Sequence, residues 1–386
     1  MALLDFWKND GIKAIRDVVS MPKVVSDIMK QLGRTEKNSG DLVINVMMVG
    51  GRRCGKTSVL ASMQSCFEEK VSQDTNLVLN TANSETLGTI EQKRAEMAMY
   101  FANKGPAKAF VPDSNPTLEL ASYGFDLELR LGQKKPGGRI CINFIDYPGE
   151  WLSDKATTEE TKQLETHMKM SRIMIIAIDT PYMMEEKGQY GEFTNRYYRV
   201  TEMIKKSGFA DGENMILFVP LKCERYFNEG KMDLVQNAIC EAYQNLIQHI
   251  KGSENCIAAI TPILTLGGAE FSHFARNEDG DIIMREGAAI PDQAIYYFPD
   301  ETVKRPEPKF CEQPLFYVLA YTLDMVKRMR EDKKNVKDEI VEWFRIQFLK
   351  WPSAEDYRAE FDKVRQKMKM SEDGYCILTK KSFLKV

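Results

Sequence analysis

The sequence is poor in histidine and has no closely spaced cysteines. Its three histidines, His167, His249 and His273, lie far apart, which argues against a histidine-based metal site and against a Ser-His catalytic triad. None of the eight cysteines forms a CxxC pair. We therefore expect reduced, mostly buried thiols rather than a disulfide or zinc framework.

Long apolar runs and a basic excess are missing as well. The run Ile173–Ile178 has six residues, whereas a membrane helix needs about 20. Charges at Asp5, Lys8 and Asp10 interrupt the N-terminal region, so we expect no signal peptide and a cytoplasmic protein. The 53 Lys and Arg residues against 56 Asp and Glu residues give a net charge of -3. This balance argues against a dedicated nucleic-acid binder.

What is present is enough apolar material for a sizeable core. The chain has 386 residues, of which 43% are hydrophobic, which predicts one large domain or two smaller ones. Strand-like apolar segments alternate with helical patterns, and this alternation predicts a layered α/β domain with a mostly parallel sheet. The predicted strands are Leu42–Val49, Leu118–Leu131, Arg139–Asp146, Ile173–Asp179, Met215–Leu221 and Cys256–Leu264, and the helices include Lys56–Phe67, Glu85–Asn103, Glu192–Lys206 and Met232–Lys251. Leu118–Leu131 and Arg139–Asp146 are expected to form a hairpin.

The strongest motif follows the first predicted strand and opens a helix. Gly50-Gly51-Arg52-Arg53-Cys54-Gly55-Lys56-Thr57 fits the phosphate-binding pattern GxxxxGK[ST]. Its backbone amides and the helix N-terminus would cradle phosphate oxygens. Lys56 would reach the β- and γ-phosphates, and the Thr57 hydroxyl would ligate Mg²⁺. Ser58, the next residue, is a further candidate for nucleotide binding.

Two arginines inside this loop are unusual. Arg52 and Arg53 could stabilise phosphate charge from within the chain. Alternatively, they point to solvent or pair with an acidic neighbour. The bulk of Arg52 could also restrict access for an arginine from a partner protein.

A second motif ends the strand Arg139–Asp146. Asp146 can hold Mg²⁺ through water, opposite Thr57. Gly149 follows three residues later, which gives the DxxG spacing of switch GTPases, and its N–H could sense the γ-phosphate. Tyr147 stands where an AAA+ ATPase would place a second acid.

The string Asp146-Tyr147-Pro148-Gly149-Glu150-Trp151-Leu152 resembles that of the bacterial YcjX-like and double-GTPase (Rab-like, TRAFAC class) proteins. Thr261–Gly268 and Gln313–Leu315 look similar too, so the resemblance covers roughly residues 42–330. It implies the three-layer α/β fold of a Ras-like P-loop NTPase, nucleotide hydrolysis and a conformational switch.

The resemblance also suggests roles for residues in the switch segments. Glu150 stands where many small GTPases carry a water-positioning Gln, so it either orients the attacking water or is an ordinary surface acid. Thr117 is the candidate for a Mg²⁺- and γ-phosphate-binding switch threonine, with Thr81, Thr86 and Thr89 as rivals.

The base-recognition motif departs from the usual pattern [NT]KxD. The matching place reads Leu221-Lys222-Cys223-Glu224. Lys222 fits and Glu224 is a longer acid, so both are candidates for base binding, but the departure leaves GTP and ATP open, with GTP preferred. Thr265-Leu266-Gly267 either contacts the base through its backbone or forms a plain turn.

The predicted domain organisation is an enlarged core with helical ends. Residues 1–40 are predicted to form amphipathic helices and a linker, residues 41–330 the P-loop domain with an inserted helical segment at about 68–116, and residues 331–386 a helical appendage outside the sheet. The insert and both extensions are candidate sites for a protein partner. Peripheral membrane contact of the mildly basic N-terminal helices is conceivable, but docking on the core is preferred.

Taken together, these patterns predict a Mg²⁺-dependent GTPase that acts as a switch or regulatory subunit, in a bacterial stress or defence assembly. The alternatives are an ATPase or phosphotransferase and a nucleotide-bound scaffold with weak turnover.

Overall fold

The computed structural model describes residues 42–73, 75–102, 119–129, 140–153, 156–253, 255–300, 302–303, 305–321 and 362–379. Residues 1–40 and Thr117, for which we made predictions, lie outside the described residues.

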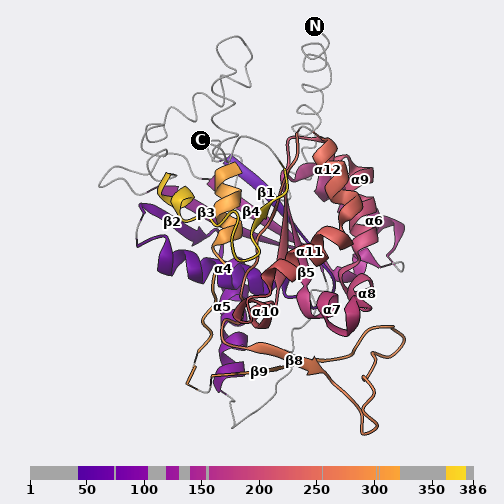
Figure 1. Ribbon diagram of the computed structural model, residues 1–386. Helices are drawn as coiled ribbons and strands as arrows, with labels where there is room; N and C mark the ends of the chain where they lie inside the picture. The colour runs from indigo at the N-terminus through magenta and orange to yellow at the C-terminus, as the bar shows by residue number, and fades with distance from the viewer. Residues whose placement is uncertain are drawn as a thin grey trace, which may run out of the picture.

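An eight-stranded sheet forms the centre of the molecule (Figure 1). Its strand order is β10-β7-β6-β5-β1-β4-β3-β2. The five strands from β7 to β4 run parallel, and β2, β3 and β10 pair antiparallel. The strands are β1 (Leu42–Val49), β2 (Leu77–Thr81), β3 (Ala121–Leu129), β4 (Ile140–Asp146), β5 (Ile173–Asp179), β6 (Met215–Leu221), β7 (Ile257–Ile260) and β10 (Cys376–Ile377). The predicted α/β fold with a mostly parallel sheet is confirmed.

The central strands are buried on both faces. Every residue of β5 and β6 is buried, as expected for strands covered by helices on either side. Both strands consist mainly of Ile, Leu, Val and Met, so their apolar runs do not alternate with polar residues. This is why the sequence alone could identify them.

Helices cover the two faces of the sheet and make three layers. One core cluster joins the sheet to α4, α5 and the helix at 313–321, and a second joins it to α6, α9, α11 and α12. Figure 1 shows α4 and α5 on one side and α6, α9 and α12 on the other. The helices are α4 (Lys56–Lys70), α5 (Ser84–Ala102), α6 (Thr158–Met170), α7 (Thr180–Met184), α8 (Gly191–Asn195), α9 (Tyr197–Ser207), α10 (Glu224–Asn228), α11 (Met232–Ala242) and α12 (Gln244–Gly252).

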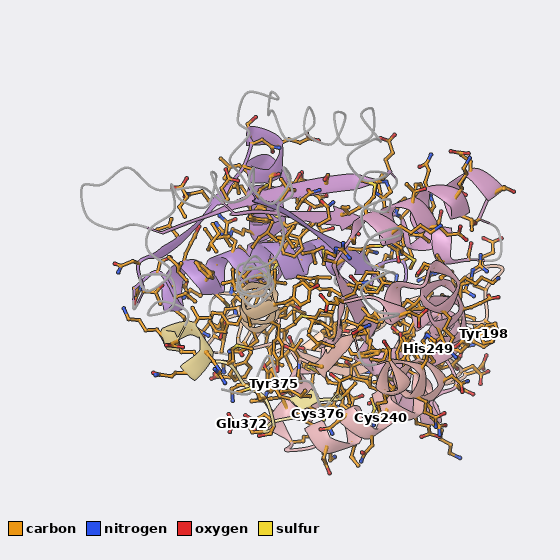
Figure 2. The ribbon with its side chains drawn as sticks, turned by 90° about the horizontal axis from the view of Figure 1, so that it is seen from above. Tyr198, Cys240, His249, Glu372, Tyr375 and Cys376 are labelled. Carbon is orange, nitrogen blue, oxygen red and sulfur yellow. The ribbon has the colours of Figure 1, made fainter. Side chains whose placement is uncertain are left out.

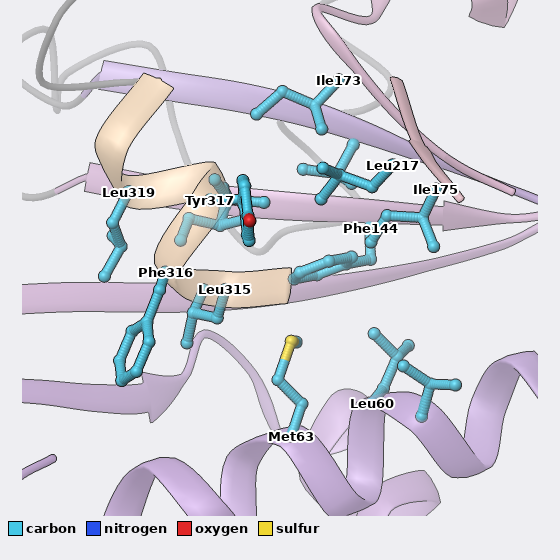
Figure 3. Close-up of a cluster of buried hydrophobic side chains, with 14 of the residues drawn as sticks. Leu60, Met63, Phe144, Ile173, Ile175, Leu217, Leu315, Phe316, Tyr317 and Leu319 are labelled. Carbon is cyan, nitrogen blue, oxygen red and sulfur yellow. The ribbon is translucent and has the colours of Figure 1, made fainter. Parts of the chain in front are cut away.

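The helix at 313–321 is a central part of the core. Figure 3 shows Leu315 and Tyr317 of this helix packed between α4 and the sheet, near Met63 and Phe144. Both Leu315 and Tyr317 have no exposed surface. The Tyr317 hydroxyl donates to the Lys369 carbonyl at 2.8 Å, which fixes the later segment 362–379 to the domain.

The segment 362–379 enters the sheet, so the prediction that the last residues stay outside it is wrong. Cys376 and Ile377 of β10 pair with β7. Figure 2 shows Tyr375 and Cys376 on the same side of the molecule as Cys240 of α11, and Gly374 packs against Met232 of that helix. A two-residue strand carries too little periodicity to be predicted from sequence.

Three further segments differ in detail from the prediction. The segment 68–116 contributes the strand β2 as well as α5. The predicted helix Glu192–Lys206 breaks at Arg196 into α8 and α9. A second sheet, β8 (Glu270–Phe274) with β9 (Ala294–Tyr297), projects from the main body (Figure 1) and was not predicted.

None of the described helices is long and apolar enough to cross a membrane. All eight cysteines are free thiols, six of them buried.

Candidate functional site

The phosphate loop connects β1 to α4 at the carboxyl edge of the parallel strands. Two of its residues have left-handed backbones, Arg53 with φ 61° and Gly55 with φ 107°. The Lys56 side chain is buried, and its Nζ donates to the carbonyls of Gly50 at 3.3 Å and Gly51 at 3.5 Å. The ammonium group therefore lies folded under the loop that would cradle a phosphate.

Asp146 lies beside this loop because β4 is the parallel neighbour of β1 and pairs Asp146 with Met48. The Thr57 hydroxyl donates to Asp146 Oδ2 at 3.1 Å, and Lys56 Nζ lies 3.6 Å from Asp146 Oδ1. Asp146 has no exposed surface. One hydroxyl and one carboxylate thus converge at the loop, which is the donor set that Mg²⁺ prefers, and they fit a magnesium ion held beside a phosphate.

The DxxG segment packs directly on the phosphate loop. A Cβ on Gly149 would lie 2.3 Å from the Arg52 amide nitrogen and 2.5 Å from the Gly51 carbonyl carbon. Only a glycine can approach so closely. The second motif is therefore in contact with the first, as its predicted role requires.

Arg52 and Glu150 form an ion pair with each other. Their side chains are 38% and 58% exposed, so the pair spans the loop and the DxxG segment at the surface. The alternative in which an arginine of the loop pairs with an acidic neighbour therefore describes Arg52. Arg53 is exposed, and the Cys54 thiol is buried, which raises its pKa.

Lys222 lies next to the phosphate loop, at the end of β6. Its Nζ donates to Asp179 Oδ2 at 2.5 Å and to the Arg53 carbonyl at 3.3 Å. Burial raises the pKa of Asp179, and the neighbouring Lys222 charge opposes that shift. Lys222 therefore holds the loop against the end of β5.

Glu224 is buried at the start of α10. Its Oε1 accepts a hydrogen bond from the Leu266 amide at 3.0 Å. Burial raises the pKa of Glu224 to about 7, although backbone hydrogen bonds oppose the shift. Glu224 and the stretch Thr265–Gly267, both predicted for the base site, are thus brought together, with the acid engaged by the backbone.

A cavity of about 910 Å³ opens beside the phosphate loop, and we call it the loop cavity. Its walls come from the phosphate loop, the DxxG segment, the ends of β5 and β6, the α8–α9 region, and the segment between β8 and β9. The lining side chains include Arg52, Arg53, Glu150, Glu160, Asp179, Tyr182, Phe193, Arg196, Lys222, Arg285, Asp292 and Tyr296.

The sequence profile of the Double-GTPase 2 family matches residues 44–261. The chain belongs to this family. The match spans β1 to the end of β7, and so includes the phosphate loop, the DxxG segment and the Lys222 motif. The resemblance to double-GTPase proteins is confirmed, and this double-GTPase is a GTP-binding P-loop protein.

The solved structures that match this chain include the S. cerevisiae Ski7 GTPase-like domain. The form bound to GDP and inorganic phosphate is 13% identical, with a TM-score of 0.34, and covers 66% of this chain and 48% of its own. The form bound to GTP is 12% identical, with a TM-score of 0.32 and the same coverage. The double-GTPase thus spans about half the length of these structures. No curated protein matches the sequence.

The structure also places residues that sequence reasoning missed. Asp179 ends a predicted strand in the same way as Asp146. This shared position at a strand end could have identified Asp179 as a site residue from the sequence. Arg196 and Arg285 line the loop cavity. No local sequence pattern predicts this position, because tertiary packing places both residues at the cavity. Ser58 is half-buried in α4 and does not line the cavity. Of the rivals of Thr117, Thr86 accepts a backbone hydrogen bond from Gly124.

Proposed function

We propose that this double-GTPase binds GTP together with Mg²⁺, hydrolyses it to GDP and phosphate, and acts as a nucleotide-dependent switch. The observation that carries the proposal is the convergence of Lys56, Thr57 and Asp146, with Gly149 packed on the same loop. Lys56 and the loop amides would hold the phosphates. Mg²⁺ would supply charge neutralisation between the β- and γ-phosphate oxygens, held by Thr57 and, through water, by Asp146.

The switch would act through the Gly149 contact. A γ-phosphate near the loop would compete for the space and the amides that now face Gly149, so the DxxG segment would move with the nucleotide state. Arg52 competes with an attacking water for the Glu150 carboxylate, so a movement of the DxxG segment that weakens this ion pair would free Glu150 to position the water.

GTP is preferred over ATP because Lys222 and Glu224 fill the lysine and acid positions of a guanine-binding motif. The second candidate is ATP. It is favoured by the bond from the Leu266 amide to Glu224, which occupies one acceptor of the acid that would read guanine, and by Leu221 in place of an amide or hydroxyl residue. A cytoplasmic setting, a protein partner bound through the switch segments and extensions, and an assembly role belong to the same proposal.

The test starts from the purified full-length chain. The co-purifying nucleotide is identified, and single-turnover phosphate release from GTP and from ATP is measured with Mg²⁺ and with EDTA. Lys56→Ala should abolish release, whereas Lys205→Ala, a change at an exposed lysine of α9, should leave it unchanged. If neither nucleotide binds the wild type, the proposal fails.

Glu150→Ala separates the two roles of that acid in the same assay, because a Gln at this position could still orient the attacking water. A catalytic Glu150 predicts a fall of about 100-fold in single-turnover release, because general-base contributions reach 100- to 10,000-fold. An unchanged rate would leave Glu150 as a surface partner of Arg52 only.

A further inference from the structure

The turn between α8 and α9 holds an arginine in an unusual backbone conformation. Arg196 has φ 56° and ψ 44°, a left-handed geometry that is uncommon for a residue with a long side chain. Such strain persists only where the surroundings hold it, and it is concentrated at functional sites. Here the neighbouring Asn195 fixes the turn, because its buried side chain accepts a hydrogen bond from the Asp179 amide at 2.7 Å and donates one to the Asp179 carbonyl at 3.2 Å.

This turn lies against the phosphate loop. A Cβ on Gly51 would come within 2.0 Å of the Thr194 carbonyl oxygen. Gly149 touches the same residue from the DxxG segment, since its Cβ would lie 2.5 Å from the Gly51 carbonyl carbon. The turn, the loop and the DxxG segment therefore meet at Gly51.

The charges of the loop cavity are mostly neutralised in pairs. Three lining cations each form an ion pair with a lining carboxylate: Arg52 with Glu150, Lys222 with Asp179, and Arg285 with Asp292 at 3.7 Å. The remaining lining acid, Glu160, is occupied in the capping box of α6, where it accepts from Thr157.

Two lining arginines remain without such a partner. Within the described ranges, no carboxylate forms an ion pair with Arg53 or Arg196. The charge of Arg196 acts on the carboxylate of Glu192. Its carboxylate oxygens accept from the Tyr198 amide at 3.2 and 3.4 Å, and burial raises its pKa while the Arg196 charge opposes the shift. The cavity thus keeps a positive excess beside Gly51.

We infer that Arg196 binds the terminal phosphate of the nucleotide and stabilises the charge that develops on it during hydrolysis. This inference rests on the proposed function and names a residue that acts from within the same chain, outside both sequence motifs. In the step, a water oxygen bonds to the γ-phosphorus and the bond from the γ-phosphorus to the β,γ-bridging oxygen breaks. The electron pair of that bond stays with the GDP, and the water proton leaves to phosphate or solvent.

An arginine suits this position better than a lysine would. Its planar guanidinium presents several N–H donors in a fixed fork that can bond two phosphate oxygens at once. The hydrogen bonds of Asn195 fix the left-handed backbone at Arg196, and this sets the position from which the arginine side chain extends. The contact would be absent with GDP alone, so it should favour the triphosphate.

The experiment compares Arg196→Lys, Arg196→Ala and Arg196→Gly with Arg199→Ala. Arg199 is the matched control, because it lies one turn further along α9 and pairs with Glu202 away from the cavity. Arg196→Gly removes the guanidinium while it suits the left-handed backbone, so it covers the case in which Arg196→Ala folds poorly. The readouts are single-turnover phosphate release and the affinities for GDP and for a non-hydrolysable GTP analogue.

The expected result is a fall of about 100-fold in phosphate release for all three Arg196 variants, as for loss of one transition-state donor. In the Arg196 variants, the affinity for the GTP analogue should fall by about 10-fold or more, and the affinity for GDP should fall by much less. Arg199→Ala should match the wild type in phosphate release and in both affinities.

Release within twofold of wild type in a folded Arg196→Gly protein would overturn the inference while leaving the proposed function intact. Equal losses of GDP and GTP-analogue affinity would overturn it as well, since they would assign Arg196 a structural role. A wild type that binds neither GTP nor ATP would instead remove the proposed function, and the inference with it.

Discussion

The two ends of the proposed nucleotide site, the phosphate end around Lys56 and the base end around Glu224, are built differently. At the phosphate end, polar side chains from the start of α4 and the end of β4 meet: Thr57 and Lys56 contact Asp146, and all three come from short sequence motifs. At the base end, Glu224 is buried and bonded to the Leu266 amide. The phosphate end therefore depends on a local backbone shape, whereas the base end depends on how α10 packs on a distant loop.

This difference has a chemical meaning. A phosphate is recognised by a loop of amides and one lysine, which any sequence of the right spacing can supply. A base is recognised by groups that must be held at a set distance from the phosphate loop. In the proposed site, Lys222 would make that link, since it donates to the Arg53 carbonyl, and Glu224 bonds the Leu266 amide from the start of α10.

The largest expected effect is at the phosphate end, with Asp146→Asn. Lys56 is buried beside Asp146, so removal of the carboxylate charge leaves a buried ammonium without its counter-charge. We expect the free energy of unfolding of the nucleotide-free protein to fall by about 3 to 5 kcal/mol. Chemical denaturation measures this, with the exposed Asp233→Asn as control.

The stability of Asp146→Asn can also be compared with and without added GTP. Its phosphates would supply the missing negative charge near Lys56, so excess nucleotide should restore part of the lost stability of Asp146→Asn. The measurement is made in EDTA, because Asp146→Asn also removes a proposed Mg²⁺ ligand. If nucleotide then stabilises the wild type but not Asp146→Asn, the placement of Lys56 at the phosphates is contradicted.

The next effect is at the base end and depends on pH. The pKa of Glu224 is about 7 in the folded protein and near 4.5 when unfolded. Because the folded state holds the proton more tightly, its contribution of about 3 kcal/mol is fully present below pH 4.5 and is lost as pH rises through 7.

Glu224→Gln removes this titration but keeps an acceptor for the Leu266 amide. Denaturation at pH 5, 6 and 7.5 should show the wild type losing stability relative to Glu224→Gln as the pH rises. The exposed Glu241→Gln serves as control. Parallel pH curves for the wild type and Glu224→Gln would show that Glu224 is not a buried, proton-holding acid.

A smaller effect is expected for Gly149→Ala, which tests the contact between the two motifs of the phosphate end. The new Cβ would overlap the backbone of Gly51 and Arg52, at a cost of about 1 to 3 kcal/mol. Thermal unfolding should show the loss together with slower phosphate release. Gly88→Ala is the control, because nothing lies within 4 Å of that Cβ in α5, and it should stabilise slightly.

The smallest effect is expected for the exposed pair Arg52–Glu150. A double-mutant cycle with Arg52→Ala and Glu150→Gln should give a coupling energy in unfolding of about 0 to 1 kcal/mol. That value should shrink further at high salt. A coupling well above this range, insensitive to salt, would mean that the pair is a structural lock between loop and DxxG segment.

The fold and the phosphate end were predictable because their signals are local. The strands β1, β4, β5 and β6 are continuous apolar runs, and the glycines, Lys56 and Asp146 stand at fixed spacings within or beside them. Neither signal requires knowledge of distant contacts.

The rest of the site depends on tertiary packing. The break at Arg196 interrupts a segment whose apolar pattern continues from α8 to α9, so the pattern predicts one helix. The wall formed by Arg285 exists only because β8 and β9 pair beside the loop cavity. The pairing of β10 with β7 joins residues more than a hundred positions apart, which no local pattern encodes.

The strand β10 has a consequence for how the protein is made. The Tyr375 hydroxyl donates to the Pro262 carbonyl at 2.7 Å, and the Leu378 amide donates to the Ala258 carbonyl at 2.8 Å. These bonds brace the stretch that leads into the Leu266 loop. Residues 375–379 leave the ribosome long after the phosphate loop has emerged, so the nascent domain can form that loop early but gains these bracing bonds only once the later segment is available.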